Sequence, residues 1–274
     1  MKKISRRSFL AAAGLSVAAL ALTACGGSSA STASSVASSA ASSEAASTSA
    51  AAGELTTVEA GKLTMATNAA FPPYEMTTDA GEFEGIDIET AQAIADKLGL
   101  ELQIDDMDFD AALLSVQQGK ADIVMAGVTV TDERKAVMDF SDSYATGIQS
   151  IIVPEGSDIA SPDDLAGKKI GTQRGTTGYI YCSDDFGDDN VVAYDDGLTA
   201  VQALNNGQVD AVVIDNAPAK EFVAANPGLV ILDTSYAEED YAIGMAKGSS
   251  LEDAVNAALE ELKADGTLQS IVDK

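Results

Sequence analysis

The chain has 274 residues, 46% of them hydrophobic, and a formal net charge of −27 at neutral pH. That length allows one large domain or two medium ones with real cores, and the charge disfavours nucleic acid or anionic lipid as a partner. The sequence contains no histidine, which excludes the commonest transition-metal ligand, the commonest general base and any Ser-His or Cys-His nucleophile pair.

The N-terminus has the pattern of an export signal. Four basic residues within the first seven precede an apolar run, FLAAAGLSVAALAL, which is too short for a secure membrane span. The run ends in LTAC, which resembles the lipobox of bacterial lipoproteins and predicts removal of residues 1–24 and lipidation of Cys25. A signal peptide that merely contains a cysteine is the alternative. The stretch SRRSFL leaves the twin-arginine and general secretory routes both open.

The next segment, to about Gly53, is almost entirely Ser, Ala, Thr and Gly. It cannot bury enough apolar surface to fold, so residues 25–54 are predicted to be a flexible tether between the lipid and the folded part. With Cys25 lipidated, Cys182 has no partner for an intrachain disulfide. We expect Cys182 to be a small buried residue in a helix, since no histidine is available to activate it.

From Leu63 onward, short β-rich runs alternate with amphipathic helices. Strands are predicted at KLTMAT, LELQID, ADIVMAG, KKIGT, NVVAY, DAVVID and LVILD. The first helix is predicted at GIDIETAQAIADKLG, where apolar residues from Ile88 to Leu98 share one face and Gly99 ends the helix. This alternation predicts an α/β fold with mainly parallel sheets.

Two segments of the chain resemble each other. DAALLSVQQGKADIVMAG (110–127) and TAVQALNNGQVDAVVID (199–215) each indicate a helix, a glycine stop, a polar step that ends in Asp, and a buried strand. Gly119 matches Gly207, and Asp122 matches Asp210. Two copies of one unit predict two similar α/β lobes, although any helix–strand unit shares part of this pattern.

Arg134 stands just after a Thr-rich loop that follows the run ADIVMAG. In open α/β sheets, ligands bind beyond the carboxyl ends of strands. Thr131 followed by two acids predicts a helix start whose free N–H groups favour an anion, and a guanidinium beside them suits a carboxylate. The alternative is a solvated arginine that pairs with Asp132 or Glu133.

Other candidates lie at further predicted strand ends. Asp215 ends the run DAVVID and can bind an ammonium group, or it can cap the helix after it. In KIGTQRGTTGYIY, Gly175 permits close backbone approach, but the segment lacks the GKS/T ending of a phosphate loop. Phe71 and Phe109 are aromatics of a type that more often belongs to a core, yet both lie at strand ends on the predicted ligand side.

The strongest pattern is the order of motifs along the chain. ATNAAFPPYE, GIDIETAQAIA, MDFDAAL, GKADIVMAGVTVTDERKAVMDFSDSY, GTQRGTTG, DAVVIDN and DGTLQSIVDK follow one another from about Leu63 to the C-terminus. In this order they resemble the polar amino-acid-binding proteins of bacterial ABC importers (solute-binding protein family 3). The resemblance implies two Rossmann-like α/β lobes joined by a two-crossing hinge, as in type II periplasmic binding proteins. Lobe 1 would comprise residues 55–147 and 240–274, and lobe 2 residues 148–239.

The resemblance also implies eleven ligand-binding residues: Asn68, Phe71, Phe109, Ala126, Gly127, Thr129, Arg134, Gln173, Thr176, Thr177 and Asp215. Arg134 would pair with the α-carboxylate of an amino acid, helped by the amides of Thr129 and of Thr176 or Thr177. Asp215 would take the α-ammonium, with the carbonyl of Gly127 and the hydroxyl of Thr129 near it.

The remaining residues would surround the ligand side chain. Phe71 and Phe109 would hold it between their rings, and Asn68, Ala126 and Gln173 would border its pocket. Receptors for cationic amino acids in this family often carry an acid where Asn68 stands, and serines where Ala126 and Gly127 stand. These departures weaken the case for lysine, arginine or histidine as the ligand without excluding them, and the identity of the bound amino acid stays open.

The function implied is that of an extracytoplasmic lipoprotein receptor. It would be a monomer, anchored to the membrane through the lipid on Cys25, that delivers a free amino acid to an ABC permease with its ATPase. No cofactor, metal or catalytic residue is implied, and no nucleic acid. Two alternatives are a cyclic carboxylate dehydratase on the same fold, with Glu75 or Asp108 as the acid, and a ligand sensor.

Overall fold

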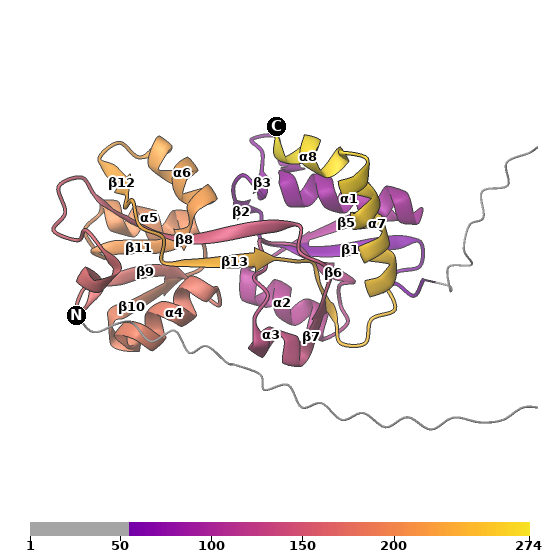
Figure 1. Cartoon of the computed structure of the whole chain (residues 1–274), viewed down its shortest axis with the longest axis horizontal. Coiled ribbons are helices and arrows are strands. Elements are labelled where there is room, and N and C mark those ends of the chain that lie inside the picture. The colour runs from indigo at the N-terminus through magenta and orange to yellow at the C-terminus, as the bar shows by residue number, and fades with distance from the viewer. Residues whose placement is uncertain (1–54) are drawn as a thin grey trace, which may run out of the picture. The chain divides into compact units, whose positions relative to one another are not determined.

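The computed structural model describes residues 55–274 (Figure 1). The predicted signal segment (1–24) and tether (25–54), with Cys25, lie outside the described residues. Two large sheets and one small sheet organise the rest of the chain, and each large sheet carries its own set of helices.

The first lobe is built on a five-stranded sheet in the order β5–β1–β6–β14–β7. These strands are β1 (Lys62–Thr67), β5 (Glu101–Asp106), β6 (Ile123–Val124), β7 (Met138–Phe140) and β14 (Gly244–Ala246). Its helices are α1 (Ile86–Leu98), α2 (Phe109–Gln117), α3 (Asp132–Val137), α7 (Glu252–Ala264) and α8 (Thr267–Val272). A small sheet lies beside them, with strands β2 (Ala70–Phe71), β3 (Glu75–Thr77) and β4 (Phe83–Glu84).

The second lobe is built on a six-stranded sheet in the order β10–β9–β11–β8–β12, with β13 also paired to β8. These strands are β8 (Ala145–Pro154), β9 (Ile170–Gln173), β10 (Val191–Tyr194), β11 (Ala211–Asp215), β12 (Leu229–Ile231) and β13 (Ala237–Tyr241). Its helices are α4 (Thr177–Phe186), α5 (Gly197–Asn205) and α6 (Asn216–Ala225), with short 3-10 turns at η1 (Pro162–Leu165) and η2 (Asp188–Asn190). Cys182 is fully buried in α4, and burial raises the pKa of its thiol to about 12, which fits the predicted inert role.

Most sequence predictions of single elements are confirmed. The run KLTMAT is β1, and the first helix ends at Gly99, which adopts the left-handed conformation of a C-cap (φ 69°). The run ADIVMAG pairs at only two residues, Ile123 and Val124. Beyond them the chain leaves the sheet and turns at Gly127 (φ 54°), which brings the following loop to the candidate site.

The expectation of mainly parallel sheets is wrong, because both large sheets are mixed. β1 pairs parallel to β5 and β6, and β9 pairs parallel to β10 and β11. The antiparallel pairs of these two large sheets all involve β8 or β14. These strands lie where the chain passes from one lobe to the other, so it enters each sheet without the crossover helix that a parallel connection needs.

Two paired strands join the lobes. β8 follows β7 of the first sheet, and β13 precedes β14 of the same sheet. They run antiparallel to each other with Ala145 opposite Tyr241 and Gln149 opposite Ala237, and Figure 1 shows them side by side between the two groups of helices. The chain therefore crosses between the lobes twice, as the hinge prediction requires.

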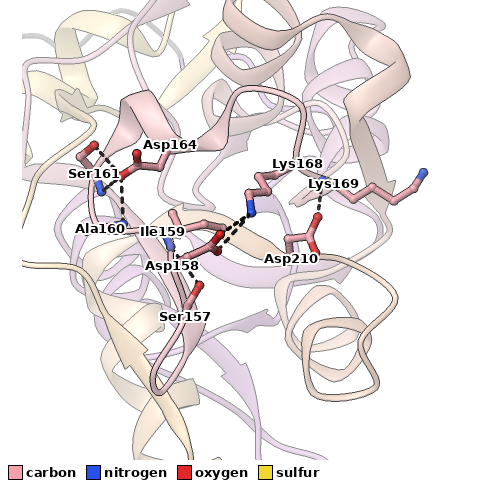
Figure 2. Close-up of polar contacts among 9 residues, drawn as sticks. All are labelled: Ser157, Asp158, Ile159, Ala160, Ser161, Asp164, Lys168, Lys169 and Asp210. Atoms are coloured by element: carbon pink, nitrogen blue, oxygen red, sulfur yellow. Dashed lines mark hydrogen bonds and ion pairs between the residues drawn. The ribbon is translucent and has the colours of Figure 1, made fainter.

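The predicted internal repeat has a physical counterpart in each lobe. Gly119 and Gly207 follow α2 and α5 with the same φ of 67°. Asp122 then accepts a hydrogen bond from the backbone N–H of Thr64 in the first half of β1 (2.8 Å), and Asp210 accepts one from the backbone N–H of Lys169 just before β9 (2.8 Å; Figure 2). Each aspartate thus ties the start of one strand to the start of its neighbour.

The turn before β9 is held by its own polar contacts. Asp164 accepts hydrogen bonds from the backbone N–H groups of Ala160 and Ser161, and Lys168 forms an ion pair with Asp158 (3.1 Å; Figure 2). These contacts are exposed, so they fix the local chain path more than they stabilise the fold.

Candidate functional site

One pocket gathers side chains from both lobes. All eleven predicted ligand-binding residues line it, and Glu75 is a twelfth. The empty space among them measures about 310 Å³, part of it continuous with solvent. All of these residues are buried except Thr176, which is half-buried. The structure thus brings the predicted residues together, while their contacts with a ligand remain a prediction. Asp108, considered as an enzyme acid, does not line the pocket.

Arg134 is held at the pocket by a short helix. Thr131 caps α3 and accepts a hydrogen bond from the backbone N–H of Arg134 (3.1 Å), as the sequence predicts. The guanidinium donates to the carbonyl of Thr129 (2.8 Å) and lies over the ring of Phe109, 5.4 Å from its centroid. Its side chain forms no ion pair with any residue of 55–274, so the alternative of a solvated arginine paired with Asp132 or Glu133 is wrong.

Arg134 also reaches the second lobe. Its guanidinium donates to the carbonyl of Gly175 (3.1 Å). Gly175 has a positive φ (75°), and a Cβ there would lie 3.1 Å from the Cβ of Asp110 in the first lobe. Nearby, Gln173 donates to the Asn68 side chain (2.8 Å). The two lobes are therefore in contact across the pocket, through the close backbone approach that the sequence predicts for Gly175.

Asp215 ends β11 and lines the pocket from the second lobe. Although it is the first residue before α6, its side chain makes no capping hydrogen bond, so the alternative of a helix cap is wrong. It instead accepts hydrogen bonds from the Gln149 amide (2.8 Å) and the Tyr241 hydroxyl. Burial raises the pKa of Asp215 to about 7, against the lowering effect of the Tyr241 hydrogen bond.

Three threonines of the site have different roles in the fold. Thr176 caps α4 by accepting a hydrogen bond from the backbone N–H of Tyr179 (3.3 Å). Thr129 and Thr177, by contrast, direct their hydroxyls to the carboxylate of Glu239 on β13 (3.2 and 2.9 Å). Glu239 and Gln149 were not predicted from the sequence, since nothing in a strand pattern marks them as neighbours of the pocket.

Glu75 is the pocket residue that the sequence did not predict as a ligand contact. It is fully buried, and its carboxylate oxygens accept no hydrogen bond from the described residues, although Asp87 lies close enough for a protonated Glu75 to donate to its carboxylate. Burial, followed by the nearby charge of Asp87, raises the pKa of Glu75 well above its usual range. Glu75 pairs with Phe71 in the small sheet, so an acid four residues after a candidate aromatic is the signal that could have found it.

Asp87 supports the pocket from behind. It accepts hydrogen bonds from the backbone N–H of Gly127 (3.0 Å) and the hydroxyl of Tyr144 (2.7 Å), while burial raises its pKa to about 6. A Cβ at Gly127 would lie 2.9 Å from the Phe71 ring. Glycine is needed here both for the left-handed turn and for this close approach.

Comparison with known proteins identifies the family. Residues 63–274 match the model of the bacterial extracellular solute-binding proteins, family 3. The chain belongs to that family. It is 34% identical over 221 residues to the L-cystine-binding protein TcyJ of Escherichia coli strain K12, covering 79% of this chain and 83% of TcyJ. It is 33% identical to the arginine-binding extracellular protein ArtP of Bacillus subtilis strain 168, covering 78% and 85%.

A solved structure agrees with the family assignment. The arginine-, lysine-, histidine-binding protein ArtJ of Geobacillus stearothermophilus is 34% identical, with a TM-score of 0.74 and coverage of 77% of this chain and 93% of that one. The family consists of extracytoplasmic solute-binding receptors and not enzymes, which supports the receptor reading over the dehydratase. Among residues 55–274, no helix combines the length and apolar character that crossing a bilayer requires.

The raised pKa of Asp215 predicts how stability depends on pH. The folded protein holds this proton more tightly than the unfolded chain, so the free energy of unfolding falls as pH rises from about 4 to about 7. Asp215→Asn mimics the protonated form and removes this loss. Relative to the wild type, we expect the variant to gain about 2–3 kcal/mol between pH 5 and pH 8 in urea unfolding without ligand. A constant difference between the two proteins across that range would contradict the expectation.

Proposed function

We propose that this receptor binds a free amino acid between its two lobes and delivers it to an ABC permease with its ATPase. The observation that carries the proposal is the placement of a buried guanidinium, Arg134, and a buried carboxylate, Asp215, in one pocket but on different lobes. The α-carboxylate of an amino acid would pair with the guanidinium of Arg134, and its α-ammonium with the carboxylate of Asp215. A ligand that touches both links the lobes, which favours the closed arrangement.

The contacts available are sufficient for useful affinity. A hydrogen bond to a charged group contributes about 1.5–3 kcal/mol, and micromolar binding needs only about 8.2 kcal/mol. The rings of Phe71 and Phe109 would add apolar contact with the ligand, although the face of Phe109 is shared with the Arg134 guanidinium. The binding function therefore needs no contact beyond those of the proposed residues.

Glu75 supports a ligand whose side chain is cationic. The Glu75 carboxyl accepts no hydrogen bond from the described residues and lies beside the acid Asp87, so its ionised form is costly, and a guanidinium or ammonium from the ligand would offset that cost. Glu75 thereby supplies the acid that is absent at Asn68. ArtP is named for arginine, and ArtJ for arginine, lysine and histidine. We infer that L-arginine or a similar cationic amino acid is the ligand.

The remaining organisation belongs to the same proposal. Residues 1–24 would direct export, Cys25 would carry the lipid, and residues 25–54 would tether the receptor to the membrane as a monomer. Residues 55–147 with 240–274 and residues 148–239 would form the two lobes that move against each other. The lipobox resemblance and the Ser- and Ala-rich composition support the anchor and the tether. A ligand sensor would share all of these features. Stimulation of a permease ATPase by the ligand-bound protein distinguishes an import receptor from a sensor.

Arg134→Met tests the receptor proposal. The change removes the carboxylate-binding charge but keeps side-chain length, and we expect at least about a 100-fold loss of L-arginine affinity by isothermal titration calorimetry. Arg174→Met is the matched control, because Arg174 is exposed and pairs only with Asp195 among the described residues. Affinity that Arg134→Met leaves unchanged would show that this arginine does not bind the ligand.

Glu75→Gln tests the proposed ligand class. L-Citrulline is nearly isosteric with L-arginine but neutral, so the wild type is expected to prefer arginine by at least about tenfold at pH 8. In Glu75→Gln that preference should fall to about twofold or less, while the exposed neighbour Glu84→Gln keeps it. A preserved preference in Glu75→Gln would refute the role of Glu75. If the protein bound only neutral amino acids, the proposal of a cationic ligand would be refuted, while the proposal of an amino-acid receptor would stand.

Cys25→Ser tests the membrane anchor. Without the acceptor thiol no lipid can be attached, and we expect the protein to move from the membrane fraction to the soluble fraction of cells that express it. Cys182→Ser is the matched control, since the chain has only two cysteines and this one is buried in α4. A Cys25→Ser protein that stays with the membrane would rule out anchoring through this residue.

A further inference from the structure

β13 carries three acids in succession, Glu238, Glu239 and Asp240, of which only Glu239 is buried. Alternation along the strand directs Glu239 and Tyr241 to the same face, while the acids on either side of Glu239 are exposed. Gly147 lies opposite Glu239 on β8, and a Cβ there would lie 2.5 Å from the Tyr241 ring. The pairing of β8 with β13 therefore places the carboxylate of Glu239 on the buried side of these strands, next to the pocket.

One oxygen of Glu239 receives hydrogen bonds from three elements. It accepts from the hydroxyl of Thr177 at the start of α4 (2.9 Å), the amide of Gln149 on β8 (3.0 Å) and the hydroxyl of Thr129 in the first lobe (3.2 Å). The two hydroxyl oxygens lie 3.5 Å apart, although they come from different lobes. The other Glu239 oxygen is buried and accepts no hydrogen bond of normal geometry among residues 55–274, while the hydroxyl of Tyr181 on α4 lies close enough to this carboxylate for it to raise the pKa of Tyr181, after burial as the first cause.

We propose that Glu239 is a positioning residue for ligand binding, which fastens Thr129 of the first lobe and Thr177 of the second to the strands that join the lobes. The contacts it makes require the lobes to be together, so they favour the closed arrangement before any ligand is present. The inference rests on the proposed function only where it concerns ligand affinity.

These contacts also fix what the threonines offer to a ligand. A hydroxyl has one proton to donate and two lone pairs. Thr129 and Thr177 donate their hydroxyl protons to Glu239. Their hydroxyl oxygens can therefore only accept hydrogen bonds from a ligand in the pocket. Acceptors suit the ammonium group of an amino acid, whereas the backbone N–H groups remain the donors for its carboxylate. Glu239 itself does not line the pocket, so it acts on the ligand through Thr129 and Thr177, which do.

The charge of Glu239 acts on Asp215 as well. The Gln149 amide donates to both carboxylates (2.8 Å to Asp215), so the two lie close together. Glu239 is the nearby charge that raises the pKa of Asp215, after burial as the first cause. The other titratable or charged groups that act on Asp215 or are influenced by it are Tyr241 on β13, Arg134 on α3, Glu75 on β3 and Tyr74.

The sign of the resulting pH dependence follows from the ammonium contact. Asp215 must be ionised to pair with an ammonium, so ligand affinity in the wild type rises with pH around a midpoint near 7. Removing the Glu239 charge lowers the proton affinity of Asp215, which moves that midpoint to lower pH. Loss of packing alone would weaken binding equally at every pH.

The test compares Glu239→Gln with Glu238→Gln, which removes the same charge from an exposed position on the same strand. Affinity for L-arginine is measured by calorimetry from pH 5.5 to 8.5. For Glu239→Gln we expect at least about a fivefold loss at pH 8.5 and a midpoint lower by about half a pH unit or more. Glu238→Gln should match the wild type. An unchanged affinity, or a loss that is equal at all pH values, overturns the proposal.

A second measurement needs no ligand. Spin labels at Leu114→Cys in α2 and Leu198→Cys in α5, both exposed positions, report the distance between the lobes in a Cys25→Ser background. We expect Glu239→Gln to lengthen or broaden this distance and Glu238→Gln to leave it as in the parent. An unchanged distribution in Glu239→Gln overturns the fastening role. If the wild type binds no amino acid, the proposed function fails, and this distance still decides the role of Glu239.

If Glu239→Gln does not fold, Thr129→Val serves instead, because it removes the donor that the first lobe offers to Glu239 and keeps the side-chain shape and the backbone N–H. We expect the same lengthening of the interlobe distance, since the hydroxyl bond between the first lobe and β13 is lost. An unchanged distance in a folded Thr129→Val protein overturns the proposal.

Discussion

The burial of the Arg134 guanidinium is the constraint on which the rest of the site depends. Removing such a charge from water costs several kcal/mol, and burial accordingly lowers the pKa of Arg134. The cost is offset by the carbonyls of Thr129 and Gly175, by the Phe109 ring and by the negative charges of Glu239 and Asp215. Two of these partners lie on different lobes, so the same contacts that keep the arginine buried also draw the lobes together.

The pocket has an excess of buried acid over buried base. Glu75 and Asp215 line the pocket with the single guanidinium of Arg134, Asp87 and Glu239 are buried behind it, and burial raises the pKa of Glu75, Asp87 and Asp215. Such a balance is unfavourable for the ligand-free fold at neutral pH, because ionising these groups together brings like charges into a medium of low dielectric. The positive charges of an α-ammonium and a cationic side chain would compensate the excess of buried acids. The same excess therefore makes the empty pocket unfavourable and makes the pocket prefer a cationic ligand.

The residues that follow strand ends could be predicted from the sequence, whereas those on the joining strands could not. Arg134, Asp215 and Thr131 stand where a parallel strand meets a helix start, and that local pattern places them whatever the rest of the chain does. Gln149 and Glu239 come together only because β8 pairs with β13, a contact between residues 90 apart in the chain. Three acids in succession indicate a solvated strand, and nothing local marks the middle one as buried. The same antiparallel joining strands made the expectation of parallel sheets wrong.

The strands that connect the lobes are therefore part of the site. Tyr241 of β13 and Gln149 of β8 donate hydrogen bonds to Asp215, and Glu239 of β13 accepts them from Thr129 and Thr177. Any rotation of one lobe against the other must lengthen bonds that converge on a single Glu239 oxygen, since its partners come from both lobes. Conversely, a ligand that neutralises Asp215 changes the electrostatic field at Glu239, because the Gln149 amide donates to both carboxylates. Ligand charge and lobe closure thus act on one carboxylate, which provides the physical link between recognition and movement.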